Sequence, residues 1–167
     1  DRSEFLEQWH HIVVWQLLEA MEVEDDPTRL ATSLTPPIEP AQAAESIALL
    51  ERLGMARRDA DGRWRQLDPI LSIAGEIPNS VTRRFYLSLN RLAAESHDRF
   101  ERDERLLSWV TLSISDKKRE EIVQEVRAFR RHLVELARRD EAPQDVHQLL
   151  IQLFPLSRTR RAKGGAK

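Results

Sequence analysis

Residues 49–65 read LLERLGMARRDADGRWR, and this stretch decides the fold. The apolar residues up to Leu53 end a helical pattern that Gly54 can close, because glycine adopts the left-handed backbone of a helix C-terminus at little steric cost. Residues 55–58 and 63–66 can then pair as two short basic strands around an Asp-Gly step, which suits a hairpin turn. A helix followed by such a hairpin is typical of a winged helix, a motif that usually contacts nucleic acid.

Three helices are predicted before the hairpin, as a winged helix requires. They run from residue 3 to about 21, from an Asp26-Pro27 cap to 34, and from Pro40 onward. The apolar stripe of the first helix is Phe5, Trp9, Ile12, Val13, Leu17 and Ala20, and that of the third is Ala43, Ile47 and Leu50. Val14 and Trp15 lie outside the first stripe, which indicates either deeper burial or contact with a partner.

A second region is predicted after a junction at residues 68–79, which hold two prolines and a glycine. Its expected elements are, in order, a helix over 81–100, a strand over 106–114, a helix from an N-cap at Ser115 to about 139, and a strand over 146–154. The two strands should pair beneath the two helices. The fold class is therefore α+β and mostly helical, with a winged helix-turn-helix over residues 1–78 and a small two-layer α+β region over residues 79–156.

The composition is that of a soluble globular chain. The 167 residues are 41% hydrophobic and 32% charged, and no apolar run is long enough to span a membrane. Cysteine is absent from the sequence, which excludes disulfides and thiolate metal sites and fits the cytoplasm. We therefore expect a cytoplasmic protein that makes no membrane contact.

The net charge of −2 hides an uneven distribution of charge. Residues 1–27 carry −7, residues 28–80 carry −1 and residues 81–167 carry +6. The last stretch, residues 157–167, reads SRTRRAKGGAK and predicts a disordered basic tail. Such a tail is either a solubilising end or an arm that binds phosphate, and the first interpretation is preferred.

Three longer stretches resemble a known family. They are SEFLEQWHHIVVWQLL from residue 3, IEPAQAAESIALLERLGMARRDADGRW from residue 38 and DVHQLLIQLFPLS from residue 145. Together they resemble a family of poorly characterised bacterial transcriptional regulators over about residues 4–157, and the last stretch is the most specific. The resemblance implies the C-terminal portion of a regulator, preceded by a helix-turn-helix domain of the repressor type. It implies no enzymatic activity and leaves open which portion contacts DNA.

Six residues are candidates for contact with duplex DNA. Four arginines cluster on the hairpin, and their forked guanidinium groups suit phosphate or a minor groove. The third helix adds two residues that can contact bases or phosphate. The six candidates are Gln42, Arg52, Arg57, Arg58, Arg63 and Arg65. Glu45 and Leu49, which are expected to face outward from the same helix, favour instead a winged helix that contacts protein.

No catalytic, cofactor or metal site is predicted. The five histidines lack metal-ligand spacing, and the adjacent His10 and His11 are expected to point to different faces of their helix. There is no nucleophile elbow and no phosphate-binding glycine loop. A pocket for a small-molecule effector between the α+β region and the hairpin is left open.

The leading hypothesis is a non-enzymatic, DNA-binding regulator of transcription. The alternative is a dimerisation or effector-sensing module whose winged helix contacts protein while a separate N-terminal domain binds DNA. Under both hypotheses we expect a homodimer, because bacterial regulators usually bind paired half-sites. The interface is expected at Val14 and Trp15, with the first helix of one copy against the α+β region of the other.

Overall fold

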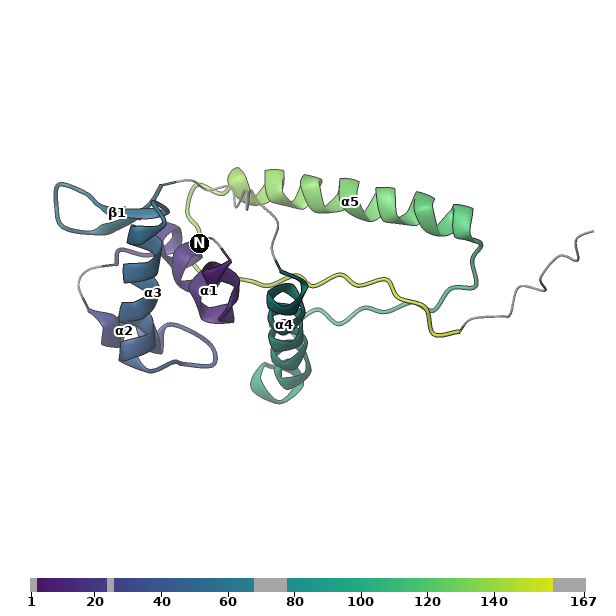
Figure 1. Ribbon diagram of the computed structural model, residues 1–167, viewed down its shortest axis with the longest axis horizontal. Helices are drawn as coiled ribbons and strands as arrows, with labels where there is room; N and C mark the ends of the chain where they lie inside the picture. The colour runs from purple at the N-terminus through teal and green to yellow at the C-terminus, as the bar shows by residue number, and fades with distance from the viewer. Residues whose placement is uncertain (1–2, 24–25, 68–77, 158–167) are drawn as a thin grey trace, which may run out of the picture.

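The computed structural model describes residues 3–23, 26–67 and 78–157. Within these ranges the chain is mostly helical and contains one two-stranded hairpin (Figure 1). The elements, in chain order, are a 3₁₀ turn η1 (Glu4–Leu6), α1 (Trp9–Ala20), α2 (Pro27–Thr32), α3 (Pro40–Arg52), β1 (Ala56–Arg58), β2 (Trp64–Gln66), α4 (Asn79–Arg99) and α5 (Asp116–Arg138).

The elements from α1 to β2 form an arrangement compatible with a winged helix, and this part of the chain, residues 4–67, is named the winged helix for that resemblance. Both α1 and α2 pack against α3, and the hairpin packs against α1 and α3. Val23 forms an isolated antiparallel bridge with Trp64, which adds a third, one-residue strand beside β2. The predicted order of three helices and a hairpin is therefore confirmed.

The local signals that set the ends of these elements act as predicted. The Asp26 side chain caps α2 by accepting hydrogen bonds from two backbone N–H groups of the first turn, both at 3.0 Å. Pro40 opens α3, and Gly54 follows its end with a φ of 67°. Residues with a Cβ rarely adopt this left-handed angle, so the glycine is needed where the chain leaves the helix for the hairpin.

The first helix differs from its prediction in length and in the face that it buries. The predicted helix from residue 3 to about 21 is broken at Gln8, whose φ of −129° and ψ of 132° are extended. Phe5 belongs to the separate turn η1, so a helical period counted from Phe5 does not continue into α1. The side chains that α1 buries are His10, His11, Val14, Trp15, Leu17 and Leu18. Of the predicted stripe, Trp9, Ile12, Val13 and Ala20 are only partly buried.

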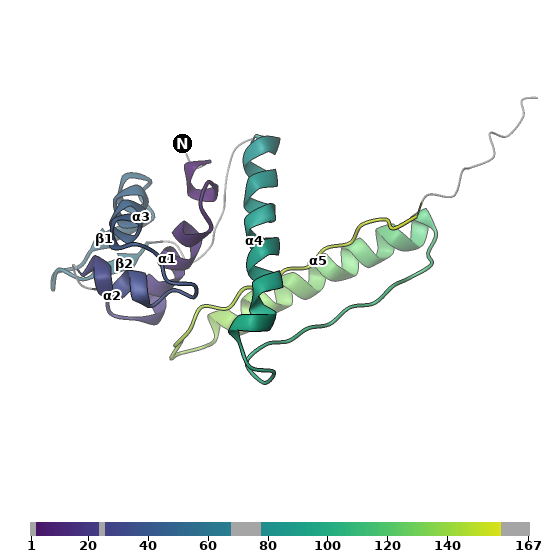
Figure 2. The same ribbon diagram turned by 90° about the horizontal axis from the view of Figure 1, so that it is seen from below.

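The second region has its two predicted helices but not its two predicted strands. α4 docks on the winged helix through Val81, and Ser115 caps α5 by accepting a hydrogen bond from the Lys118 N–H at 3.2 Å. Residues 106–114 and 146–154 contain no strand and run as drawn-out segments on opposite sides of α5 (Figure 2). A strand requires the backbone of another strand beside it, and neither segment pairs with one among the residues that the structure describes. The predicted two-layer region is therefore wrong for a single chain.

The hydrophobic core lies almost wholly within the winged helix. Its buried side chains come from residues 5–64, joined by Val81 at the start of α4. The helix α5 buries none of its residues, although the sequence predicts burial of Ile122, Val126, Phe129, Leu133 and Leu136. Most of the predicted junction at 68–79 and of the tail at 157–167 lies outside the described residues.

Candidate nucleic-acid interface

The hairpin brings together four of the six predicted DNA-contact residues, namely Arg57, Arg58, Arg63 and Arg65. Its strands pair antiparallel, with Arg57 opposite Arg65. Asp59 shapes the turn between the strands, because its Oδ1 accepts hydrogen bonds from two backbone N–H groups of the turn at 2.9 and 3.0 Å. Gly62 completes the turn with a φ of 78°. The Asp and Gly signals in the sequence therefore fix the backbone from which the arginines extend.

Three of the predicted cations are paired with carboxylates of the chain itself. Arg63 Nη1 lies 2.6 Å from Glu22 Oε1, Arg65 Nε lies 2.9 Å from Asp59 Oδ2, and Arg52 Nη2 lies 2.5 Å from Glu4 Oε2. The hydrogen bond from Arg52 lowers the pKa of Glu4 to about 2, and the hydrogen bond from Arg65 lowers the pKa of Asp59. A guanidinium that already binds a carboxylate must release it before it can bind phosphate in the same way.

Arg57 and Arg58 are the hairpin arginines with exposed side chains. Arg58 Cζ lies 4.9 Å from the centroid of the Trp64 ring, in a cation–π contact that holds the guanidinium against the hairpin. Trp64 itself is only 4% exposed, so its ring belongs to the core and is not available for stacking on a base. The surface with which the hairpin could contact phosphate is therefore smaller than the sequence predicts.

The outward face of α3 is acidic. Glu45 and Glu51 are exposed on this helix, and the exposed Ala44 and Ala48 carry no polar side-chain group. Gln42 is half-buried, and its side-chain oxygen accepts the Glu39 N–H at 3.0 Å, so this side chain caps the helix. Leu49, which the sequence predicts to face outward, is 8% exposed and therefore buried. The helix thus offers little of the cationic and amide surface with which recognition helices contact bases.

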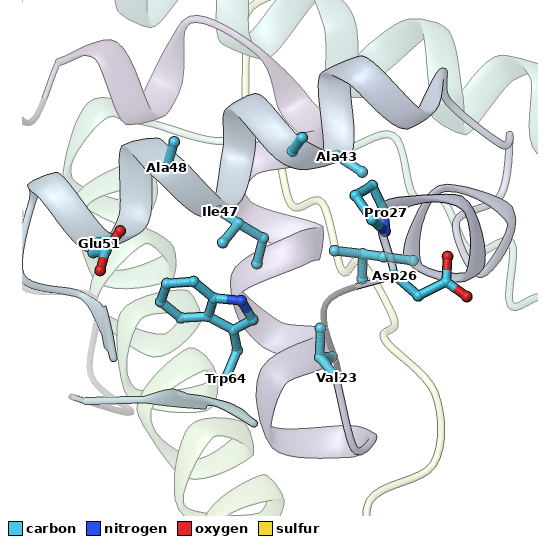
Figure 3. A pocket seen from close by; sticks show the side chains of 10 residues that line it. Val23, Asp26, Pro27, Ala43, Ile47, Ala48, Glu51 and Trp64 are labelled. Atoms are coloured by element: carbon cyan, nitrogen blue, oxygen red, sulfur yellow. The ribbon is translucent and has the colours of Figure 1, made fainter. Parts of the chain in front are cut away.

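A shallow hollow lies beside α3, between this helix, the start of α2 and Trp64 of the hairpin (Figure 3). Its volume is about 140 Å³, and its lining includes the carboxylate residues Asp26 and Glu51. These charges would repel a phosphate. Small-molecule sites commonly enclose about 300–1,000 Å³, and the hollow is smaller than that.

A buried histidine pair lies where α1 packs on α3, and sequence reasoning missed it. His10 and His11 are 3% and 8% exposed, and their rings lie 4.6 Å apart, contrary to the prediction that they point to different faces. His11 Nδ1 lies 2.8 Å from Ser46 Oγ, which donates its own hydrogen bond to the Gln42 carbonyl oxygen at 2.8 Å. The hydroxyl therefore accepts from His11, which assigns the proton to Nδ1 of a neutral imidazole. Burial lowers the pKa of both histidines, that of His11 to about 4.

The predicted dimer contacts, Val14 and Trp15, lie inside the chain's own core. They are 0% and 2% exposed, and Trp15 Nε1–H donates to the Met55 carbonyl oxygen at 3.3 Å. Phe5 also packs edge-on against the Trp15 ring, with 6.0 Å between the ring centroids. Neither side chain is available to a second copy, so this placement of the interface is wrong. Exposed apolar side chains lie instead mainly in residues 86–156.

Two further kinds of feature are absent from the part of the chain that the structure describes. It contains no group of three or more His, Cys, Asp or Glu side chains that could hold a metal ion. None of its helices has the length and apolar character needed to cross a membrane.

Comparison with known proteins gives one match. Residues 1–156 match the family described as Domain of unknown function (DUF4423). The match covers nearly the whole chain, including the winged helix, α4, α5 and both drawn-out segments. No curated protein and no solved structure matches the chain.

Proposed function

The chain belongs to the DUF4423 family, and we propose that it is the protein-contact part of a bacterial regulator of transcription, without enzymatic activity. In this proposal the winged helix supports contacts between protein chains, and a separate domain of the full-length regulator reads the operator. The resemblance of three sequence stretches to bacterial transcriptional regulators supports the general class.

The acidic outward face of α3 is the observation that carries the proposal. A winged helix that reads DNA places its third helix in the major groove, between two rows of phosphates. Here that helix presents Glu45 and Glu51, whose charges oppose such a position. Arg52, at its end, is already bound to Glu4. These charges favour a protein partner over nucleic acid at this face.

Contact between the wing and DNA is the second candidate function, and the exposure of Arg57 and Arg58 favours it. Two arginines can add affinity by binding phosphate, but phosphate contacts carry no sequence information. The wing would then assist the binding of another domain and would not choose the operator.

Fluorescence anisotropy with a labelled duplex of mixed sequence separates the two candidates. We expect weak binding by this chain, with a slope of log affinity against log salt no steeper than about −2, because each phosphate contact contributes roughly 0.9 to the slope. The double variant Arg57→Ala with Arg58→Ala should change this weak binding no more than the control variant does.

The matched control is Arg83→Ala with Arg84→Ala, which removes two adjacent, exposed arginines from α4. Binding that is lost in the wing variant and kept in the control would establish the wing as a DNA contact. The proposal would then give way to the second candidate.

A further inference from the structure

We propose that residues 106–114 and 146–154 are strands of a β-sheet that forms only between two copies of the chain, with α5 of each copy covering that sheet. The inference rests on the proposed function, since it takes the chain to be a protein-contact module. It goes further by naming both the contact surface and the partner, which is a second copy.

The backbones of both segments lack backbone partners, although the Leu149 carbonyl oxygen accepts a hydrogen bond from the Gln148 side chain at 2.9 Å. No backbone N–H or carbonyl group within residues 106–114 or 146–154 forms a backbone–backbone hydrogen bond in the part of the chain that the structure describes. Neither segment contains Asp, Glu, Lys, Arg or Pro, the residues that protect exposed sheet edges from pairing. Drawn-out, uncharged segments of this kind are templates for pairing with another strand.

The side chains of both segments are apolar and largely exposed. In the first segment Leu106, Trp109 and Val110 are 86%, 87% and 73% exposed, and in the second Phe154 is 63% exposed. Alternate residues of an extended chain share one face. By this rule one face of the first segment holds Leu106, Val110, Leu112 and Ile114, and one face of the second holds Leu149, Ile151 and Leu153. Such faces are typical of strands that cover a hydrophobic layer.

The helix between the segments is also uncovered. α5 has 23 residues and buries none of them, and Phe129, Val134 and Leu136 are about half exposed. An amphipathic helix gains most of its stability from packing its apolar stripe against another layer. In Figure 1 both segments run in the same direction beneath α5, as they do in a strand–helix–strand unit. The unit therefore has a helix and two drawn-out segments placed like strands, but the segments form no sheet.

The uncovered surface is large enough for a stable dimer. Fourteen large apolar side chains between residues 106 and 156 are each at least 38% exposed. At roughly 100 Å² for a fully exposed aliphatic side chain and 150–250 Å² for an aromatic one, they present on the order of 1,000 Å². The largest apolar patch of a soluble monomer is about 300–600 Å², whereas a standard interface buries about 800 Å² on each partner. The exposed apolar surface is therefore larger than the patch expected of a monomer, and it is as large as one side of a standard interface.

A second copy is the partner that this surface fits. The described part of the winged helix covers little of this surface. Its core packs against Val146 at the start of the second segment, and its large apolar side chains are otherwise packed against one another, with Leu67 the exposed exception. The two segments need strands to pair with, and α5 needs a sheet to pack on. A second copy of the same unit supplies strands, and the sheet that forms is the layer that α5 needs. A two-fold pairing of identical units satisfies both copies with the same residues. Segments without cations would not bind nucleic acid.

Two measurements on the intact chain test the inference. Analytical ultracentrifugation should give twice the chain mass of 19.4 kDa. Hydrogen exchange should show slowed amide exchange across 106–114 and 146–154, because these amides are hydrogen-bonded only in the dimer. Val110→Asp should convert the dimer to a monomer and release the protection, since the new charge would be buried in the sheet.

Leu67→Asp is the matched control, because it places the same charge at an exposed apolar side chain outside the two segments, and it should leave the dimer intact. A monomeric wild type with fast exchange in both segments overturns the inference. Slow exchange in a monomeric wild type also overturns it, because the segments would then pair within one chain. A dimer whose segments stay unprotected, or a dimer that Val110→Asp leaves intact, places the contact elsewhere. Neither measurement involves DNA, so failure here is distinguishable from failure of the proposed function.

Discussion

The winged helix buries most of its large apolar side chains, whereas the region after it leaves most of them exposed. Between residues 5 and 64 these side chains form a core in which Val14, Ala43 and Leu50 are fully buried. Between residues 86 and 156 most large apolar side chains remain exposed. Both regions carry apolar residues at helical or strand spacing, so the difference is not one of pattern. It lies in whether the chain itself supplies the layer that covers the pattern.

The first region forms a closed hydrophobic core because its elements pack around α3. α1, α2 and the hairpin all contact this helix, and Val23 joins the hairpin through Trp64. In the second region α5 has no such neighbour, and the segments beside it form no sheet. A domain needs at least two packed layers around a core, and the second region of a single chain has one.

A pair of tryptophan substitutions gives the largest expected contrast between the two regions. Trp15 is 2% exposed and donates a hydrogen bond to Met55, whereas Trp109 is 87% exposed. Trp15→Ala should lower the free energy of unfolding of the winged helix by about 3–5 kcal/mol, through the cavity that it leaves. Trp109→Ala should leave that unfolding transition unchanged. Urea unfolding followed by circular dichroism measures both effects.

The contrast fails if the two variants destabilise the winged helix equally. In that case Trp109 would belong to the same folding unit as Trp15, and the second region would not be an open layer. A loss of dimer mass in Trp109→Ala, with the urea midpoint of the winged helix unchanged, would agree with the inferred sheet.

The sequence correctly predicted the structural features that depend on neighbouring residues. The cap at Asp26, the end of α3 at Gly54 and the turn at Asp59 each depend on residues within four positions, and the structure confirms each one. The face of α1 could not be found in the same way, because the break at Gln8 resets the helical period. The spacing of His10 and His11 from Val14 and Trp15, four residues on, was a signal for the true buried face.

The sequence could not predict which of the candidate DNA-contact arginines are paired with a carboxylate, because those carboxylates are distant in sequence. Arg63 pairs with Glu22, 41 residues away, and Arg52 pairs with Glu4, 48 residues away. A cluster of arginines in a sequence therefore predicts where cations lie, but not which of them are already paired. The two strands of the second region are a stronger case, since the partner that we infer for them lies in another molecule.

The buried histidine pair should make the winged helix sensitive to acid. An unfolded histidine has a pKa of about 6.5, and burial holds the pKa of His11 at about 4 in the folded chain. Between these values the unfolded state binds more protons, so the free energy of unfolding should fall as the pH falls from about 6.5 to 4. The loss for His11 alone is about 3 kcal/mol, and the contribution of His11 should be constant above about pH 7.

Urea unfolding at a series of pH values measures this loss, and the double variant His10→Gln with His11→Gln is the control that should flatten the slope. Glu45 is the charged group that acts on the pair, and it raises the pKa of His10 against the effect of burial. A slope that survives in the double variant would assign the acid sensitivity to other groups. Glu4, whose pKa is about 2, would contribute only below its ordinary value of 4.5.

The smallest expected effect concerns the N-cap of α5, and it tests the second region, whose side chains are mostly exposed. Ser115 Oγ accepts the Lys118 N–H at 3.2 Å, and Ser115→Ala should cost about 1 kcal/mol of local helix stability. Because α5 buries no residue in a single chain, the loss should appear as roughly fivefold faster amide exchange in its first turn, with the winged helix unchanged. Ser157→Ala, at an exposed position outside the helices and outside both segments, is the matched control and should change nothing. If α5 covers an intermolecular sheet, Ser115→Ala should also weaken the dimer by a similar factor. Weaker association in Ser115→Ala and not in Ser157→Ala would connect the helix to the interface, whereas unchanged association would separate the two.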